Sequence, residues 1–416
     1  MNKTTQKILR PFVLLKRELI WMKHNRFFYK ASRKHSSLQP VDKNHVRICF
    51  VIQRTEIFTS VQTIFEQCCS NDQFDVSVMV LPRYDHGARK IDIQSIEKNL
   101  EFCRSLKGEF TLLNPYNEQT GEFADLTPNQ FDFIFLAMPY QKQYPDKYSF
   151  AYLSNIGRLC CIPYGCYFAD GKTMIRFGFP HELLMHVDYM FADVDNVYQF
   201  VNGKLCLSRN RDNKPIPYLV GYPRFDLVKR NETATSCKTF LWLPRWTISS
   251  TDNEKSSFLD YKDLFLSYFR EHSELSLIIR PHPAMFENYI SNGIMSQKEV
   301  EDYKNTIAEM ENVVLDSNPS YSTSFDQADC VVADYTSLVI EFLLTNKPVI
   351  YLGETENMEE DIKSSFYCCD SFDSITSSMI QLNSGKDKTV ANRAKVLIDP
   401  KYKPGASARI IDVLLK

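Results

Sequence analysis

One short segment of the chain combines residue types that suit phosphate chemistry. Leu277–Pro283 reads LIIRPHP, so an apolar run typical of a buried strand is followed at once by Arg280. His282 comes two residues later and lies between two prolines. Proline fixes φ, which predicts a stiff turn at the carboxyl end of the strand. Arginine offers a permanently charged fork that fits phosphate, and histidine can donate a hydrogen bond or a proton near neutral pH. The segment indicates an anion site, with a structural turn and a surface histidine as the alternative.

A second segment, Asp329–Gly353, again runs from an apolar strand into a helix. Hydroxyl groups and free N–H groups at the start of a helix favour an anion, although ordinary capping of the helix requires the same residue types. Glu341 lies four residues after Ser337, on the same helix face, and is a candidate for contact with a ribose or glycerol hydroxyl. The polar residues between strand and helix are Asp334, Tyr335, Thr336 and Ser337.

The elements that would position these residues form two series of short apolar strands alternating with amphipathic helices. Such alternation predicts βαβ units and parallel sheets buried on both faces. We therefore expect an α/β fold with two Rossmann-like domains that face a cleft, in which ligands bind outside the carboxyl ends of the strands. The domains are predicted at residues 44–228 and 229–416, after a basic arm at residues 1–43. The main expected strands are Arg47–Gln53, Asp75–Leu81, Phe133–Met138, Leu159–Ile162, Val187–Phe191, Thr239–Leu243, Leu275–Ile279, Cys330–Ala333 and Val349–Leu352, with a closing helix at Ala406–Leu415.

The net charge of −2 hides an uneven distribution. Residues 1–41 hold ten Lys or Arg against the single acid Glu18, so this arm carries +9 and the rest of the chain sums to −11. Apolar residues at helical spacing in the arm predict an amphipathic helix on an anionic membrane surface, or else a helix docked on the body. No nucleic-acid partner is expected, because no binding module is recognisable.

The rest of the composition is that of an ordinary globular protein. Hydrophobic residues make up 44% and charged residues 24% of the chain, which excludes a disordered chain and a multi-span membrane protein. No apolar run reaches the length of a membrane span, and charges interrupt the apolar stretch of the arm, so no signal peptide is predicted. The 12 cysteines lack metal or disulfide spacing. These features predict a protein of the reducing cytosol, with the basic arm as its contact to the cytoplasmic face of a membrane.

Taken in order, four motifs resemble the CDP-glycerol glycerophosphotransferase family, whose members build teichoic acids and related capsule polymers. They are GYPRFD at 221–226, Pro-Arg-Trp at 244–246, IIRPHP at 278–283 and VVADYTSLVIEFLLTNKPVIYL at 331–352. The resemblance implies a GT-B-like fold with the donor held by the C-terminal domain, and no cofactor or metal. It implies transfer of glycerol phosphate, or a similar polyol phosphate, from a CDP-activated donor to a hydroxyl of a polymer or lipid-linked acceptor, with release of CMP.

The resemblance also implies roles for individual residues. His282 and Arg280 would contact the donor pyrophosphate as catalytic residues. Glu341 would contact a hydroxyl group, and Arg245 would supply a cation, two positions earlier than the family's usual arginine. The residues that would line the phosphate end of the donor site are Asp334, Tyr335, Thr336 and Ser337.

On the acceptor side the chain departs from the family pattern. Where the family often carries a His-Gly pair, this chain has Tyr164 and Gly165. An unperturbed tyrosine has a pKa near 10 and is a poor base at neutral pH, so Asp170 or His181 would have to serve, or the acceptor chemistry differs. Two alternatives remain open: a GT-B glycosyltransferase with a nucleotide-sugar donor, and a non-catalytic nucleotide-binding scaffold of an envelope-assembly complex.

Overall fold

The computed structural model describes residues 38–416, apart from 86–89, 129, 170–174, 176–177, 203–215, 232–235, 249–254 and 319–320. The predicted amphipathic helix of the arm therefore lies outside the described residues. The chain forms two compact units. The first unit comprises Met1–Tyr164, Lys172–Asp226 and Gly405–Lys416, and the second unit comprises Gly165–Gly171 and Leu227–Pro404.

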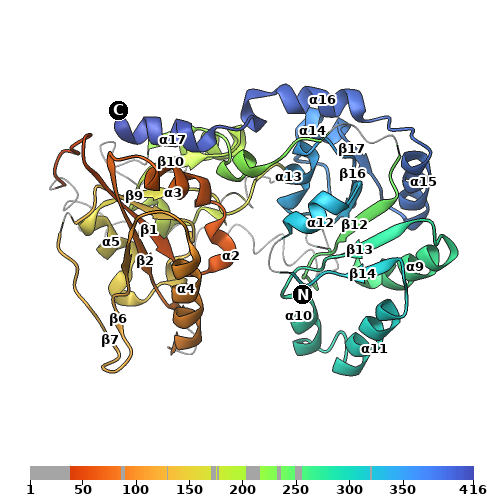
Figure 1. Ribbon diagram of the computed structural model, residues 1–416, viewed down its shortest axis with the longest axis horizontal. Coiled ribbons are helices and arrows are strands. Elements are labelled where there is room, and N and C mark those ends of the chain that lie inside the picture. Colours follow the sequence, from red (N-terminus) through yellow and green to blue (C-terminus); the bar gives the residue numbers. More distant parts are fainter. Residues whose placement is uncertain are drawn as a thin grey trace, which may run out of the picture. The chain divides into compact units, whose positions relative to one another are not determined.

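The first unit is built on a parallel sheet of seven strands in the order β11-β10-β9-β8-β1-β2-β5 (Figure 1). Its interior strand β1 is buried along almost its whole length, as expected for a strand covered on both faces. The strands are β1 (Val46–Ile52), β2 (Phe74–Val80), β5 (Thr111–Leu113), β8 (Phe133–Leu136), β9 (Arg158–Cys161), β10 (Val187–Ala192) and β11 (Ile216–Leu219).

Helices and two short hairpins complete the first unit. The hairpins pair β3 (Arg83–Asp85) with β4 (Lys90–Asp92), and β6 (Tyr116–Asn117) with β7 (Glu122–Phe123). The helices are α2 (Thr55–Phe58), α3 (Gln62–Cys69), α4 (Ile93–Ser105), α5 (Phe150–Ile156), α7 (His181–Leu184), α8 (Asp195–Asn202) and α17 (Ala406–Leu415), with 3-10 turns η2 (Gln141–Gln143), η3 (Asp146–Tyr148) and η6 (Pro223–Leu227).

The closing helix α17 belongs to the first unit, although it follows the second unit in the chain. The carboxylate of Asp226 accepts hydrogen bonds from the N–H groups of Gly405 (2.6 Å), Ala406 (3.1 Å) and Ser407 (3.0 Å). The Ser407 hydroxyl also lies 2.6 Å from the hydroxyl of Thr63 in α3. The acid that ends the GYPRFD motif thus satisfies the free N–H groups at the start of α17 and fixes this helix on the unit.

The second unit has a parallel sheet of six strands in the order β14-β13-β12-β15-β16-β17. Its core centres on Trp242, which is fully buried and packs against Phe258 and Phe265 of α9. The strands are β12 (Thr239–Leu243), β13 (Ser276–Ile279), β14 (Val313–Leu315), β15 (Cys330–Ala333), β16 (Val349–Tyr351) and β17 (Phe366–Cys368). The helices are α9 (Phe258–Glu271), α10 (Met285–Ser291), α11 (Gln297–Ala308), α12 (Ser322–Gln327), α13 (Leu338–Leu344), α14 (Glu360–Ser364), α15 (Phe372–Asn383) and α16 (Val390–Ile398), with the 3-10 turn η8 (Pro400–Tyr402).

The predicted α/β class with two parallel sheets is confirmed. The strand that precedes each predicted donor loop ends where the sequence indicated: β13 at Ile279 and β15 at Ala333. The unit boundary at Asp226–Leu227 lies close to the predicted boundary after residue 228, whereas the predicted C-terminal domain included α17. Within the described residues, no helix has the length and apolarity needed to span a bilayer.

Candidate functional site

Three loops of the second unit emerge side by side from its sheet. The register pairs Trp242 of β12 with Ile279 of β13, and Leu243 of β12 with Ala333 of β15. Because these strands are parallel neighbours, their carboxyl ends meet at one edge of the sheet. The loop after β12 carries Arg245, the loop after β13 carries Arg280 and His282, and the loop after β15 carries residues 334–337. The three loops thus bring Arg245, Arg280, His282 and residues 334–337 to one edge of the sheet, whereas Glu341 lies within α13 (Leu338–Leu344).

Backbone hydrogen bonds join the loops that follow β12 and β13. The N–H of Arg280 donates to the carbonyl oxygen of Trp242 at 2.9 Å, and the N–H of His282 donates to that of Pro244 at 3.1 Å. The ladder between the two strands therefore continues beyond their ends. This pairing, together with the two prolines that flank His282, fixes the backbone on which Arg245 and His282 are carried.

The side chain of Asp334 connects the loops at this edge of the sheet through hydrogen bonds. Its side chain is 2% exposed, and its Oδ2 atom accepts hydrogen bonds from the N–H of Arg245 (2.7 Å) and of Ser257 (3.0 Å). Burial raises the pKa of the Asp334 carboxyl, while these hydrogen bonds favour its charged form. The carboxylate ties the loop after β12 and the start of α9 to β15. Asp334 is therefore a positioning residue for Arg245 in this structure.

Arg280 is anchored by an acid that sequence reasoning missed. Its Nη1 atom lies 2.6 Å from Oδ2 of Asp316, which directly follows β14, and both side chains are largely buried. Asp316 also accepts hydrogen bonds from the backbone N–H of Asn318 at 2.9 Å and from the Ser324 hydroxyl. Although burial acts to raise it, the pKa of Asp316 lies below its usual value because Ser324, Asn318 and Arg280 donate to the carboxylate. An acid just after a neighbouring strand was the only signal for this pair in the sequence.

The ring of His282 is fixed in one tautomer. Its Nδ1 atom accepts a hydrogen bond from the N–H of Ala284 at 3.2 Å, so the proton of the neutral ring is on Nε2. His282 is an exposed residue, but the surrounding protein partly desolvates its ring. This desolvation, together with the charge of Arg245, lowers the pKa of His282 to about 4. At neutral pH, His282 is therefore an uncharged hydrogen-bond donor.

Arg245 and Tyr335 form a stack beside His282. The guanidinium carbon of Arg245 lies 5.1 Å from the centre of the Tyr335 ring, and its Nη1 atom donates to the Tyr335 carbonyl oxygen at 3.3 Å. Tyr335 also contacts the buried Phe168, whose ring is stacked on the Tyr335 ring with 5.7 Å between the ring centres. The aromatic pair supports Arg245 and restricts the directions in which its charge can point.

The remaining donor candidates differ in their surroundings. The hydroxyl of Thr336 accepts from the N–H of Leu338 at 3.4 Å, whereas the side chain of Ser337 makes no capping hydrogen bond to α13. Gly165 lies against Ser337, since a Cβ atom at Gly165 would come within 3.2 Å of the serine hydroxyl oxygen. Ordinary capping therefore explains Thr336 better than Ser337.

Glu341 is buried at 1% exposure inside α13, and its Oε2 atom accepts the hydroxyl of Tyr321 at 2.6 Å. In this structure the hydroxyl that Glu341 contacts belongs to Tyr321, a residue of the protein. A contact with a ligand hydroxyl stays a prediction.

On the acceptor side, Tyr164 is half-buried in the first unit, and its hydroxyl lies 3.2 Å from that of Tyr140. Burial, followed by the neighbouring Tyr164, raises the pKa of Tyr140. Asp170 lies outside the described residues, and His181 is the first residue of α7. The acceptor base therefore stays a prediction.

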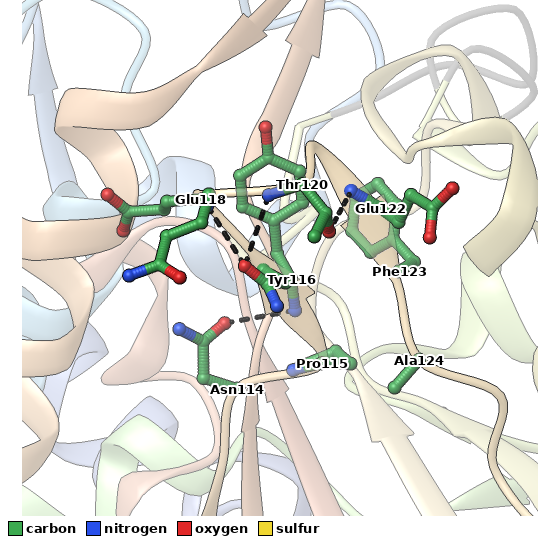
Figure 2. A pocket seen from close by; sticks show the side chains of 10 residues that line it. Asn114, Pro115, Tyr116, Glu118, Thr120, Glu122, Phe123 and Ala124 are labelled. Atoms are coloured by element: carbon green, nitrogen blue, oxygen red, sulfur yellow. Dashed lines mark hydrogen bonds between the residues drawn. The ribbon is translucent and has the colours of Figure 1, made fainter.

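A surface hollow elsewhere holds none of these residues. Figure 2 shows that it is lined by a single stretch, Asn114–Ala124, around the β6–β7 hairpin of the first unit. The side chain of Asn117 accepts the N–H groups of Gln119 and Thr120 there, as expected for a tight turn. In the part of the chain that the structure describes, no cluster of His, Cys, Asp or Glu has the arrangement of a metal site.

Comparison with known proteins finds a family match over part of the chain and solved structures of similar fold. Residues 209–366 match the family CDP-Glycerol:Poly(glycerophosphate) glycerophosphotransferase. No curated protein sequence gives a match. The fold is similar to that of the UDP-GlcNAc 2-epimerase from Neisseria meningitidis bound to UDP-GlcNAc, with 11% identity, a TM-score of 0.54 and coverage of 89% of this chain and 99% of the other.

Two further solved structures share the fold. The S. aureus MnaA–UDP co-structure has 11% identity and a TM-score of 0.54, with coverage of 88% and 95% of the two chains. A variant of the wall teichoic acid polymerase TagF has 11% identity and a TM-score of 0.51, with coverage of 100% and 98%. These likenesses establish the GT-B-like fold. The family match includes Arg245, Arg280, His282 and Asp334, and it confirms that the chain resembles the CDP-glycerol glycerophosphotransferase family over this stretch.

Proposed function

We propose that the protein transfers glycerol phosphate from CDP-glycerol to a hydroxyl group of a cell-surface polymer and releases CMP. The observation that carries the proposal is that the family match spans residues 209–366, and that Arg245, Arg280 and His282 within it share one edge of a parallel sheet. That edge is where ligands of open α/β sheets bind. Two arginines and a hydrogen-bond donor suit a nucleotide diphosphate.

The chemistry follows from these groups. The acceptor oxygen attacks the phosphorus that bears glycerol, the bond from that phosphorus to the bridging oxygen of CMP breaks, and CMP leaves with the electron pair. The proton of the acceptor hydroxyl passes to a base on the acceptor side. Positioning and charge stabilisation provide most of the catalysis in such a displacement. Arg245 and Arg280 would hold the diphosphate, and Nε2–H of His282 would donate to the leaving phosphate.

A bound diphosphate would change the protonation of His282. Its pKa is lowered to about 4 by desolvation and by Arg245. An anion beside the ring favours the imidazolium form, so donor binding would raise this pKa. His282 would then become able to give a proton to the departing CMP as well as a hydrogen bond.

The most direct test of this proposal is to measure which class of nucleotide donor the protein turns over. The full-length protein would be incubated with CDP-glycerol or with UDP-GlcNAc, each with a poly(glycerol phosphate) acceptor, and nucleotide release would be measured by chromatography. We expect CMP release from CDP-glycerol and no release of UDP from UDP-GlcNAc. Turnover of the nucleotide sugar alone would contradict the proposal and favour a glycosyltransferase.

The location of the enzyme is part of the same proposal. A lipid-linked acceptor lies at a membrane, and the ten basic residues among 1–41 would hold the enzyme on the anionic cytoplasmic face. Polybasic segments contribute about 1 kcal/mol of binding free energy for each basic residue close to such a surface.

A further inference from the structure

A cluster of polar side chains lies in the first unit, which contains none of the proposed donor residues. Strands β9, β8 and β1 are consecutive parallel neighbours in its sheet. Just beyond their carboxyl ends follow Tyr164, Tyr140 and Arg54, so these three residues share one edge of the sheet. The short strand β3, which carries Arg83, contacts the 3-10 turn η2 that directly follows Tyr140. Arg54, Arg83, Tyr140 and Tyr164 are called the edge cluster below.

The edge cluster brings together the positive charges of two arginines, Arg54 and Arg83. Arg54 is half-buried, and its Nε atom is shielded from solvent without a hydrogen-bond partner among the described residues. Burial, and then the charge of Arg83, lower the pKa of Arg54, so the two cations lie within electrostatic range. The nearby Glu56 is paired with Lys98 at 2.6 Å. A buried donor and two like charges are costly unless an anion joins them.

The tyrosines add neutral donors to the same place. The hydroxyls of Tyr140 and Tyr164 lie 3.2 Å apart, so at most one of them donates to the other and a second O–H remains for a ligand. Tyr164 also lies within electrostatic range of Arg54. Guanidinium forks with adjacent hydroxyl donors match the tetrahedral oxygens of a phosphate.

We propose that the edge cluster binds a phosphate group of the acceptor, a chain of polyols joined by phosphodiesters. This inference rests on the proposed function, which assigns the nucleotide diphosphate to the second unit and so leaves the acceptor as the other anionic substrate. It gives Tyr164 the role of a hydrogen-bond donor to the acceptor chain, in place of the base that the family carries at this position.

The test uses the full-length protein and a synthetic tri(glycerol phosphate) as the probe, with affinity measured by calorimetry. Replacing Arg54 or Arg83 by glutamine should weaken binding about tenfold or more, the loss expected when one charged hydrogen bond to phosphate is removed. Arg104→Gln is the matched control, because Arg104 is an exposed arginine of the same unit at the end of α4. This control should change the affinity less than about twofold, and free glycerol should not bind.

The outcomes separate this inference from the proposed function. Unchanged affinity in both Arg54→Gln and Arg83→Gln, or an equal loss in Arg104→Gln, would overturn the edge cluster as a phosphate site. Because Arg83 is exposed, its variant should fold, and thermal unfolding would verify this. Turnover of CDP-glycerol is measured separately. Absent turnover with arginine-dependent binding of the oligomer would contradict the proposed function and leave the phosphate site standing.

Discussion

The tautomer and the pKa of His282 are determined by neighbouring residues. The N–H of Ala284 occupies Nδ1, which leaves the proton on Nε2, and desolvation with Arg245 lowers the pKa to about 4. Asp316 likewise fixes the direction of the Arg280 guanidinium group through their ion pair. The types of the catalytic candidates were predictable from LIIRPHP, whereas their supporting partners were not. Asp316 comes 36 residues after Arg280 in the chain and reaches it only because β13 pairs with β14.

The pKa of His282 provides a prediction at this scale. Nuclear magnetic resonance titration of the free protein should show the His282 ring becoming protonated near pH 4, and addition of CDP should move this transition to higher pH because the anion favours the charged ring. A transition near the ordinary histidine pKa of about 6.5 in the free protein, or a downward shift with CDP, would contradict the account.

The ion pair of Arg280 provides a second prediction. Asp316→Ala should lower the free energy of unfolding by about 3 kcal/mol, because it removes the carboxylate that is ion-paired with a largely buried guanidinium. The control Asp263→Ala removes an exposed surface pair with Lys262 and should cost under about 1 kcal/mol. The folded-state pKa of Asp316 is lowered, so its contribution is fully present above the unfolded pKa of about 4 and is lost as pH falls through the folded value. Equal losses in the two variants, measured by urea unfolding, would refute this assignment.

Among the helices and strands, local sequence patterns predicted individual strands and turns. The packing of these elements depends on contacts between residues far apart in the chain. β13 and β15 were predictable because each is a compact apolar run ended by polar residues or proline. The unit to which α17 belongs was not, because it depends on Asp226, which caps the helix from about 180 residues earlier in the chain. The hydrogen bonds of the Asp334 carboxylate were likewise not predictable from the sequence, since the donors come from the loop after β12 and the start of α9.

The cap on α17 provides the prediction at this scale. Asp226→Ala removes the acceptor of three backbone N–H groups and should lower the free energy of unfolding by about 1–2 kcal/mol. Asp412→Ala is the control, since it removes an exposed acid from the same helix and should have little effect. Chemical denaturation of both variants would measure the difference. If Asp226→Ala is as stable as the control, the cap does not hold α17 in place.

At the scale of the whole molecule, charge is divided between the arm and the remainder of the chain. Residues 1–41 carry +9, and the rest of the chain sums to −11. The family match begins at residue 209, so neither the arm nor most of the first unit is covered by it. The proposed membrane contact and acceptor site therefore depend on charge distribution and on the edge cluster.

Deletion of residues 1–41 tests the role of the arm. The full-length protein should sediment with vesicles that contain anionic phospholipid, and the truncated protein should remain in the supernatant, because the remaining chain is acidic. Added salt should weaken the binding of the full-length protein, since it screens charge attraction. Equal binding of both forms would show that the arm is not the membrane contact.

The proposed transfer of glycerol phosphate at the loops after β12 and β13 can be measured directly. Glycerol-labelled CDP-glycerol would be supplied with a poly(glycerol phosphate) acceptor, and label in the polymer would be compared with CMP released. We expect one CMP for each glycerol phosphate incorporated, a fall in rate of about 100-fold or more in His282→Ala, and a nearly unchanged rate in His272→Ala, which removes a partly exposed histidine at the end of α9 in the same unit. CMP release without incorporation of label, or full incorporation by His282→Ala, would contradict it.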